Sequence, residues 1–295
     1  MNAIVDSHAH VLSGDFEAFP TLPLPEEMKA RCRASEFSAE RLLQQMDENG
    51  VGMALMVQRR QVYGFDNHYI CSAAAIAPDR LFPVVAIDAT SESQVEDAIF
   101  WLERGAVGFR LMQRPGMAGM DWLGGEMASP LWRLAQERQV PICVHLFPAM
   151  RPEGLQLLAR LVADYPDVPV VIDHLSNQSY SDPLDGPDAL IAPFADMPNI
   201  ALKFTAIPLA RIVGDGFDPM AILQRFIARF GADRLMWGTD ISQSPGSYEE
   251  LVELGRSAVA GLSEPHRALL LGGTAARIYA LDKAGSNVDL LRKTV

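Results

Sequence analysis

The stretch AIVDSHAH, residues 3–10, is a short apolar run that ends in two histidines spaced by one residue. An apolar run of this length predicts a buried β-strand. Seven similar runs follow at a spacing of about thirty residues, which is typical of repeated βα units. They are VGMALMVQ (51–58), LFPVVAID (81–88), AVGFRLM (106–112), VPICVHL (140–146), PVVIDHL (169–175), IALKFTA (200–206) and LMWGTDI (235–241).

Continuous apolar strands that alternate with helices predict a parallel sheet covered on both faces. Eight of them favour an α/β fold of the TIM type, a closed (β/α)8 barrel. A doubly wound Rossmann-like sheet is the alternative, but no Gly-x-Gly-x-x-Gly follows the first strand. Because no linker rich in Pro, Gly or Ser divides the chain, we expect one domain over residues 1–281 and a loosely held extension over 282–295.

Four segments between the strands carry helix start signals, in which a capping residue precedes Pro or stands three residues before Gln or Glu. Two of these helices are expected to end at Gly105 and Gly231. The expected caps are Ser91 with Gln94, Ser129 with Pro130, Asp218 with Pro219, and Ser247 with Glu250. Two long irregular segments, 11–36 and 113–128, follow the first and fourth strands, and we expect them to be loops on the catalytic face of the barrel.

The composition is that of a globular protein, with 49% hydrophobic and 21% charged residues. A formal net charge of -12 argues against nucleic acid as a partner. No segment has the length and hydropathy of a signal peptide or membrane span. The three cysteines, Cys32, Cys71 and Cys143, are expected to be free thiols in a cytoplasmic protein.

Four of the six histidines, with one aspartate, fall at predicted strand ends. His8 and His10 point to the same side of the first strand, because side chains alternate along a strand. His145, His174 and Asp240 end the fifth, sixth and eighth strands, and a barrel would bring them to one mouth. A single such histidine is more often structural than a ligand, but the complete set favours a metal site with an activated water.

The chain resembles the amidohydrolase superfamily, in the branch often labelled amidohydrolase 2. The resemblance rests on DSHAH (6–10), CVHL (143–146), IDHLS (172–176), DRLMWGTD (233–240) and LLLGGTAARIYAL (269–281), which span nearly the whole chain. It implies a (β/α)8 hydrolase or non-oxidative decarboxylase. It also implies that His8, His10, His145 and Asp240 belong to a metal site, with His174 as a neighbouring ligand or acid/base group.

One departure concerns the number of metals. Binuclear members of the family carry a bridging lysine or glutamate on the fourth strand, where this chain has GFRLMQ (108–113). This favours one divalent metal, zinc or manganese. The details GFRLMQ and ALKFTA (201–206) are most similar to the lactonase subgroup that includes 2-pyrone-4,6-dicarboxylate lactonase, in which some members work without a metal.

Several cationic residues near the predicted strand ends indicate a small anionic substrate, because arginine forms bidentate pairs with carboxylates. Arg110 ends the fourth strand with Arg114 beyond it, Arg59 follows the second strand, and Lys203 lies in the seventh. For Arg59 and Lys203 the alternatives are a solvent-facing residue and the partner of a buried acid. Trp122, in the fourth loop, is a candidate to contact a flat ring.

The first functional hypothesis is hydrolysis of a carboxylated lactone in carboxylic acid catabolism. Asp240, alone or with a metal, activates water; His145 and His174 assist, with His174 polarising the carbonyl or protonating the leaving oxygen. The alternatives are metal-dependent decarboxylation of an aromatic or unsaturated acid and a catalytically inactive barrel that serves as a scaffold. Assembly into a homo-oligomer is a further expectation.

Overall fold

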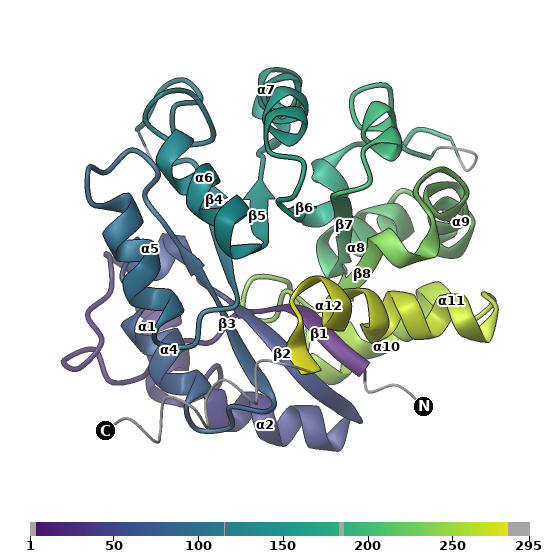
Figure 1. Cartoon of the computed structure of the whole chain (residues 1–295). Coiled ribbons are helices and arrows are strands. Elements are labelled where there is room, and N and C mark those ends of the chain that lie inside the picture. Colours follow the sequence, from purple (N-terminus) through teal and green to yellow (C-terminus); the bar gives the residue numbers. More distant parts are fainter. Residues whose placement is uncertain (1–3, 115, 183–185, 283–295) are drawn as a thin grey trace.

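The fold is an eight-stranded parallel barrel surrounded by helices (Figure 1). The computed structural model describes residues 4–114, 116–182 and 186–282. Neighbouring strands pair in sequence order, which confirms the predicted (β/α)8 class and all eight predicted strands. The strands are β1 (Ile4–Ala9), β2 (Val51–Val57), β3 (Leu81–Ala86), β4 (Gly108–Met112), β5 (Ile142–His145), β6 (Val170–Ile172), β7 (Ile200–Thr205) and β8 (Leu235–Gly238).

Helices follow the strands around the outside of the barrel. The short turn Asp173–Asn177 follows β6, and a π-helical segment, Leu269–Gly273, leads into the last helix. The helices are α1 (Glu26–Arg33), α2 (Ala39–Glu48), α3 (Arg60–Tyr63), α4 (His68–Ala74), α5 (Gln94–Leu102), α6 (Ser129–Arg138), α7 (Arg151–Asp164), α8 (Ala206–Gly214), α9 (Pro219–Phe230), α10 (Tyr248–Val259), α11 (Glu264–Ala268) and α12 (Thr274–Ile278).

Two of the four predicted helix caps are confirmed. Asp218 accepts a hydrogen bond from the Met220 backbone N–H, and Ser247 forms a capping box with Glu250. The prediction of Ser91 as a cap is wrong, because α5 begins at Gln94, whose side chain donates to the Ser91 carbonyl instead.

The predicted cap at Ser129 is wrong as well. Ser129 is the first residue of α6, and its hydroxyl donates to the Gly125 carbonyl.

The apolar core has an outer and an inner part. The outer part lies between the strands and the helices and includes Phe109, Trp132 and Trp237. The inner part fills the barrel with one inward side chain from most strands, and Tyr279 closes it from below. Figure 1 shows α12, in yellow, beside the first strand. Tyr279 is the residue directly after this helix. The amino-terminal end of the barrel is therefore plugged, and the carboxyl end is left for chemistry.

The barrel closes where β1 meets β8. The Asp240 backbone N–H donates to the His8 carbonyl at 2.7 Å. The Asp6 carboxylate accepts from the Thr239 backbone N–H and hydroxyl, at 2.9 and 2.5 Å. At Gly238, an added Cβ would lie only 2.7 Å from the His8 Cβ and backbone nitrogen, so this close approach requires glycine. The seam fixes His8 and Asp240 relative to each other.

The long segment after β1, which was predicted to be irregular, includes a helix. The loop 11–36 contains α1, and Leu12 and Cys32 pack in a small apolar cluster beside the barrel. Most of the predicted extension, residues 283–295, lies outside the described residues. Within the ranges that the structure describes, no helix has both the length and the apolar character needed to cross a membrane.

Candidate active site

Five predicted site residues come together at the carboxyl end of the barrel, and all five are buried. His8 and His10 lie at the end of β1, His145 ends β5, and His174 and Asp240 follow β6 and β8. Ring centroids are 5.0 Å apart between His8 and His10 and between His8 and His174, and 5.1 Å apart between His145 and His174. The fold thus joins residues that are widely separated in sequence.

The two histidines of β1 both direct Nε2 toward Asp240. Nδ1 of His10 lies 2.6 Å from the Val57 carbonyl oxygen, which can only accept, so this nitrogen carries the hydrogen. Nε2 of His10 lies 3.1 Å from Asp240 Oδ1, and Nε2 of His8 lies 3.5 Å from the same oxygen. Among the described residues, His8 Nε2 and Asp240 Oδ1 have no hydrogen-bond partner. Buried polar atoms without a partner are costly, so this geometry needs a further group.

A divalent cation fits this position. The ligand atoms of His8, His10 and Asp240 all lie within 4.8 Å of one another, and imidazole with carboxylate is a donor set that zinc favours. His145, predicted as a further ligand, belongs to neither metal-compatible group found within the described ranges. The second such group joins His8, Asp173 and His174, but the carboxylate of Asp173 is already held by cationic side chains.

Asp240 combines a strained backbone with an ionised side chain. Its φ of 55° is left-handed, a conformation that aspartate tolerates better than most residues. Burial opposes ionisation, but contact with His10 and the neighbouring imidazoles His174 and His8 hold the pKa of Asp240 well below its usual range. The carboxylate is therefore charged at neutral pH and can accept a proton only from an activated donor.

The histidines of the cluster are neutral at physiological pH. Burial is the largest cause, and it lowers the pKa of His8, His10, His145 and His174 below the ordinary value of an imidazole. A neutral imidazole has one nitrogen that donates and one that accepts. Each ring can therefore serve as a ligand or as a hydrogen-bond donor, according to which nitrogen faces the substrate.

His174 reaches the site through an unusual turn. Strand β6 ends at Ile172, shorter than predicted, and the four residues His174–Asn177 all have left-handed φ values between 49° and 60°. Val171 faces the barrel interior, so a continued strand would send His174 outward. The turn redirects the ring inward, where Nδ1 lies 2.6 Å from the Thr205 hydroxyl. Such backbone strain concentrates at functional sites.

The sequence reasoning did not single out Asp173. It is fully buried below the histidine cluster, and its Oδ1 lies 3.3 Å from His8 Nδ1 and 3.6 Å from Lys203 Nζ. Burial would raise its pKa, but the contact with His8 and the charges of Lys203 and Arg110 hold the pKa of Asp173 well below its usual range. Strand alternation from Val171 was the available signal, because it places Asp173 on the inward face.

Arg110 and Lys203 both point into the barrel. Arg110 donates to the Gln58 carbonyl at 3.0 Å and to Asp173 Oδ2 at 3.2 Å, and it also borders the pocket described below. Lys203 is fully buried beneath the site and is paired with Asp173. This matches the alternative expectation for Lys203, a partner for a buried acid, and the acid is Asp173.

The other three predicted substrate contacts have different surroundings. Arg59 is buried and donates to the Ser242 carbonyl and hydroxyl and to the Gln243 side chain, so it holds the loop after β8. The half-exposed side chain of Arg114 pairs with Asp88 at 3.3 Å. Trp122 packs in the outer core and is not among the residues that line the pocket. The structure does not gather Arg114 and Trp122 with the histidines.

A pocket of about 190 Å³ opens onto the cluster. It is lined by His10, Arg110, His145, His174 and Asp240, and by residues that the sequence did not reveal. Those additional residues are Gln61, Phe147, Pro148, Asn177, Ile207, Arg211 and Gln243. A cationic and amide-rich wall facing neutral imidazoles and a carboxylate suits a small anionic molecule.

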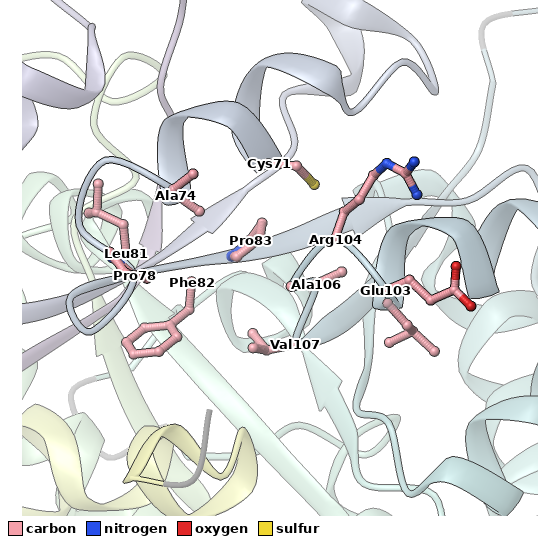
Figure 2. Close-up of a pocket in the computed structure, with 13 residues that line it drawn as sticks. Cys71, Ala74, Pro78, Leu81, Phe82, Pro83, Glu103, Arg104, Ala106 and Val107 are labelled. Atoms are coloured by element: carbon pink, nitrogen blue, oxygen red, sulfur yellow. The ribbon is translucent and has the colours of Figure 1, made fainter. Parts of the chain in front are cut away.

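A second pocket, of about 310 Å³, lies outside the barrel at the starts of β3 and β4 (Figure 2). Its wall is largely apolar and includes Pro83 and Val107, with Cys71 at one side. Burial raises the pKa of the Cys71 thiol to about 12, so the thiol is protonated and unreactive. The lining also includes Glu103 and Arg104, but the pocket lies at the amino-terminal end of the barrel, opposite the end where TIM-barrel enzymes carry their active sites.

Comparison with known proteins gives one family match. A model described as amidohydrolase matches residues 5–281. No curated protein matches the chain.

Among solved structures, three similarities are informative. A probable 2-pyrone-4,6-dicarboxylic acid hydrolase from Acinetobacter baumannii with citric acid bound has a TM-score of 0.72 and 19% identity, and the match covers 95% of this chain and 100% of that one. An amidohydrolase from Burkholderia multivorans with bound zinc has a TM-score of 0.70 and 20% identity over 94% and 99% of the two chains. A 2,6-dihydroxybenzoate decarboxylase from Rhizobium has a TM-score of 0.63 and 14% identity over 96% and 100%. At these identities the similarity is one of fold.

Proposed function

Since this chain belongs to the amidohydrolase family and is an enzyme, we propose that it hydrolyses a small cyclic ester that carries a carboxylate. The observation that carries the proposal is the meeting of His8 Nε2, His10 Nε2 and Asp240 Oδ1 beside a pocket whose wall includes Arg110 and Arg211. Groups that activate water thus adjoin groups that bind an anion.

Asp240 is proposed as the proton acceptor. Its ionised carboxylate lies at the pocket wall, where it would take a proton from water as the water attacks the ester carbonyl carbon. The Ser244 hydroxyl donates to Asp240 Oδ2 at 3.3 Å, which leaves Oδ1 directed at the two imidazoles. Oδ2 of Asp240 is therefore the oxygen held by the protein, and Oδ1 is the oxygen proposed to react.

His174 is proposed to act on the ester oxygens. In the tautomer in which the Thr205 hydroxyl donates to Nδ1, the neutral ring carries its hydrogen on Nε2 and would donate it to the carbonyl oxygen as negative charge develops there. After the tetrahedral intermediate forms, collapse breaks the bond to the ring oxygen, which takes up the proton that Asp240 accepted from water and becomes a hydroxyl group. His145, whose ring neighbours His174, lines the same wall and is the other candidate donor.

His8, His10 and Asp240 would hold a single divalent cation, zinc or manganese. When bound, the cation would supply Lewis acidity that favours deprotonation of water at neutral pH. Arg110 and Arg211 would orient the substrate carboxylate, since both side chains line the pocket wall. The same residues could act without the cation, with Asp240 as the sole activator of water.

The proposal is tested with a panel of carboxylated lactones and their open-chain hydroxy acids. Each turnover adds water and releases one proton from the new carboxylic acid at neutral pH, so a pH indicator follows the reaction. Lactone ring opening supports the proposal. Release of CO₂ from aromatic or unsaturated acids, without lactone hydrolysis, would instead identify a decarboxylase.

A further inference from the structure

A buried carboxylate beneath the site has no role in the reaction described above. Oδ1 of Asp173 lies 3.3 Å from His8 Nδ1 and 3.6 Å from Lys203 Nζ, and it accepts a hydrogen bond from the Cys143 thiol at 2.9 Å. Its other oxygen, Oδ2, accepts from Arg110 at 3.2 Å. Contacts on both oxygens fix this carboxylate in one orientation.

The position of Asp173 bears on which nitrogen of His8 carries the hydrogen. With the hydrogen on Nδ1, His8 donates to Asp173 and leaves the Nε2 lone pair directed at the metal-compatible position. With the hydrogen on Nε2, Nδ1 could accept from Lys203 at 3.4 Å, but its lone pair would face the Asp173 carboxylate at 3.3 Å. Repulsion between the two acceptors disfavours the second form.

The neighbouring histidine supports this assignment. His10 has its hydrogen on Nδ1 because that nitrogen contacts the Val57 carbonyl. If His8 carried its hydrogen on Nε2, the facing acceptor would be Asp240 Oδ1 at 3.5 Å, and this contact does not form a hydrogen bond, because Nε2 has no hydrogen-bond partner among the described residues. Both rings are thus best described with Nε2 lone pairs that face Asp240 Oδ1, and three such acceptors are compatible when a cation lies between them.

We propose that Asp173, itself held by Lys203, is a positioning residue that keeps the hydrogen of His8 on Nδ1 and thereby sets the affinity of the His8, His10 and Asp240 site for a divalent cation. The inference rests on the metal site of the proposed function. A carboxylate that accepts from the distal nitrogen of a ligating histidine fixes the ring and raises its basicity, and loss of such a partner lowers metal affinity about 10- to 100-fold.

The first experiment reads the histidine directly, without metal or turnover. Long-range proton–nitrogen NMR spectra of chelator-stripped protein with labelled histidine distinguish the two neutral forms of each ring. The wild type is expected to show His8 with hydrogen on Nδ1, and Asp173→Asn is expected to shift His8 toward hydrogen on Nε2. His10 is the internal control, because its Val57 contact is unchanged. An unaltered His8 signal in Asp173→Asn overturns the proposal.

The second experiment measures zinc affinity by competition with a chromogenic chelator. Asp173→Asn should bind zinc about 10- to 100-fold more weakly than the wild type. The matched control is Cys143→Ala, which removes a contact to the same Oδ1 but keeps the carboxylate, and it should bind zinc within about threefold of the wild type. Unchanged affinity in Asp173→Asn overturns the link to the metal even where the His8 signal shifts.

Two further results separate the possible failures. Asp173→Asn leaves the buried charge of Lys203 without its partner and can therefore prevent folding. In that case the double variant Asp173→Asn with Lys203→Met is measured in place of the single variant. Zinc that does not bind to the wild type counts against the metal of the proposed function, and it is recognised before any variant is made. The His8 signal still decides the role of Asp173 in that case.

Discussion

Nη2 of Arg110 lies 3.2 Å from Oδ2 of Asp173, so the arginine that borders the pocket is anchored by the same carboxylate that contacts His8. Arg110 also donates to the Gln58 carbonyl, and these two contacts hold the guanidinium before any substrate arrives. Binding to such a prearranged cation costs little side-chain entropy. The part of the pocket wall that Arg110 forms and the metal-compatible position are therefore joined by one buried network.

Substitution of Arg211 tests the anion-binding wall with little disturbance of that network. Arg211 lines the pocket and donates to the Gln178 carbonyl, but within the described part of the chain it makes no hydrogen bond or ion pair with Asp173 or the histidines. Arg211→Gln should raise KM about tenfold, because the substrate loses a charge-assisted hydrogen bond, and it should have a smaller effect on kcat. Steady-state kinetics on the best lactone measure the split. The control is Arg229→Gln on the exposed face of α9, and equal KM values in both variants would remove Arg211 from the binding wall.

Asp240→Asn tests the proton acceptor. Asparagine tolerates the left-handed φ of 55° at this position, so the fold should persist. Loss of a general base lowers kcat about 10²- to 10⁴-fold, while the thermal unfolding temperature should stay close to that of the wild type. Single-turnover kinetics and a melting curve check both parts. Near-normal turnover by a folded variant would show that another group accepts the proton.

Metal removal tests whether the proposed cation is needed. Dialysis against a chelator should abolish lactone hydrolysis, and one equivalent of zinc or manganese should restore it, because His8, His10 and Asp240 form one group that could hold a metal ion. Elemental analysis before and after dialysis gives the stoichiometry. Full activity in protein with no detectable metal would assign water activation to Asp240 alone.

The barrel itself was predictable because its signal is repeated eight times. Each strand is a run of apolar residues such as Val84 and Val144, and their burial on both faces leaves a pattern that does not depend on long-range detail. His8, His10 and His145 were predictable for the same reason, since regular strand alternation fixes the direction of their side chains. The Ser129 cap failed because a local hydrogen bond to Gly125 competes with the capping contact.

The network around Asp173 was less accessible from the sequence. The left-handed turn at His174 depends on contacts with Thr205 and on packing of Leu175, which no local motif encodes. Arg59 and Lys203 illustrate a second difficulty. Both were expected near the strand ends, but whether a cation faces substrate or a buried acid depends on the partners that the fold supplies.

Acidification should destabilise the metal-free enzyme near the pKa of an ordinary histidine. Burial lowers the pKa of His8, His10, His145 and His174 in the folded state, so below about pH 6.5 the unfolded chain binds more protons than the folded one. Stability then falls as the pH falls from 7.5 to 5.5. Melting curves of chelator-stripped protein measure this slope, which His145→Gln should reduce. A flat profile would mean that the folded protein takes up the same protons.

Closure of the barrel depends on the lack of a side chain at Gly238. An added Cβ would lie 2.7 Å from both the Cβ and the backbone nitrogen of His8, and neither atom can move without displacing β1. Gly238→Ala should therefore lower the free energy of unfolding by about 1–3 kcal/mol or more, as overpacking does, and should also lower activity because His8 shifts. Gly214→Ala at the exposed end of α8 is the matched control, since an added Cβ there meets no atom within 4 Å. Helix propensity predicts that this control is neutral or slightly stabilising. Chemical denaturation compares the two variants, and equal stability would show that the seam between β1 and β8 can open to admit a methyl group.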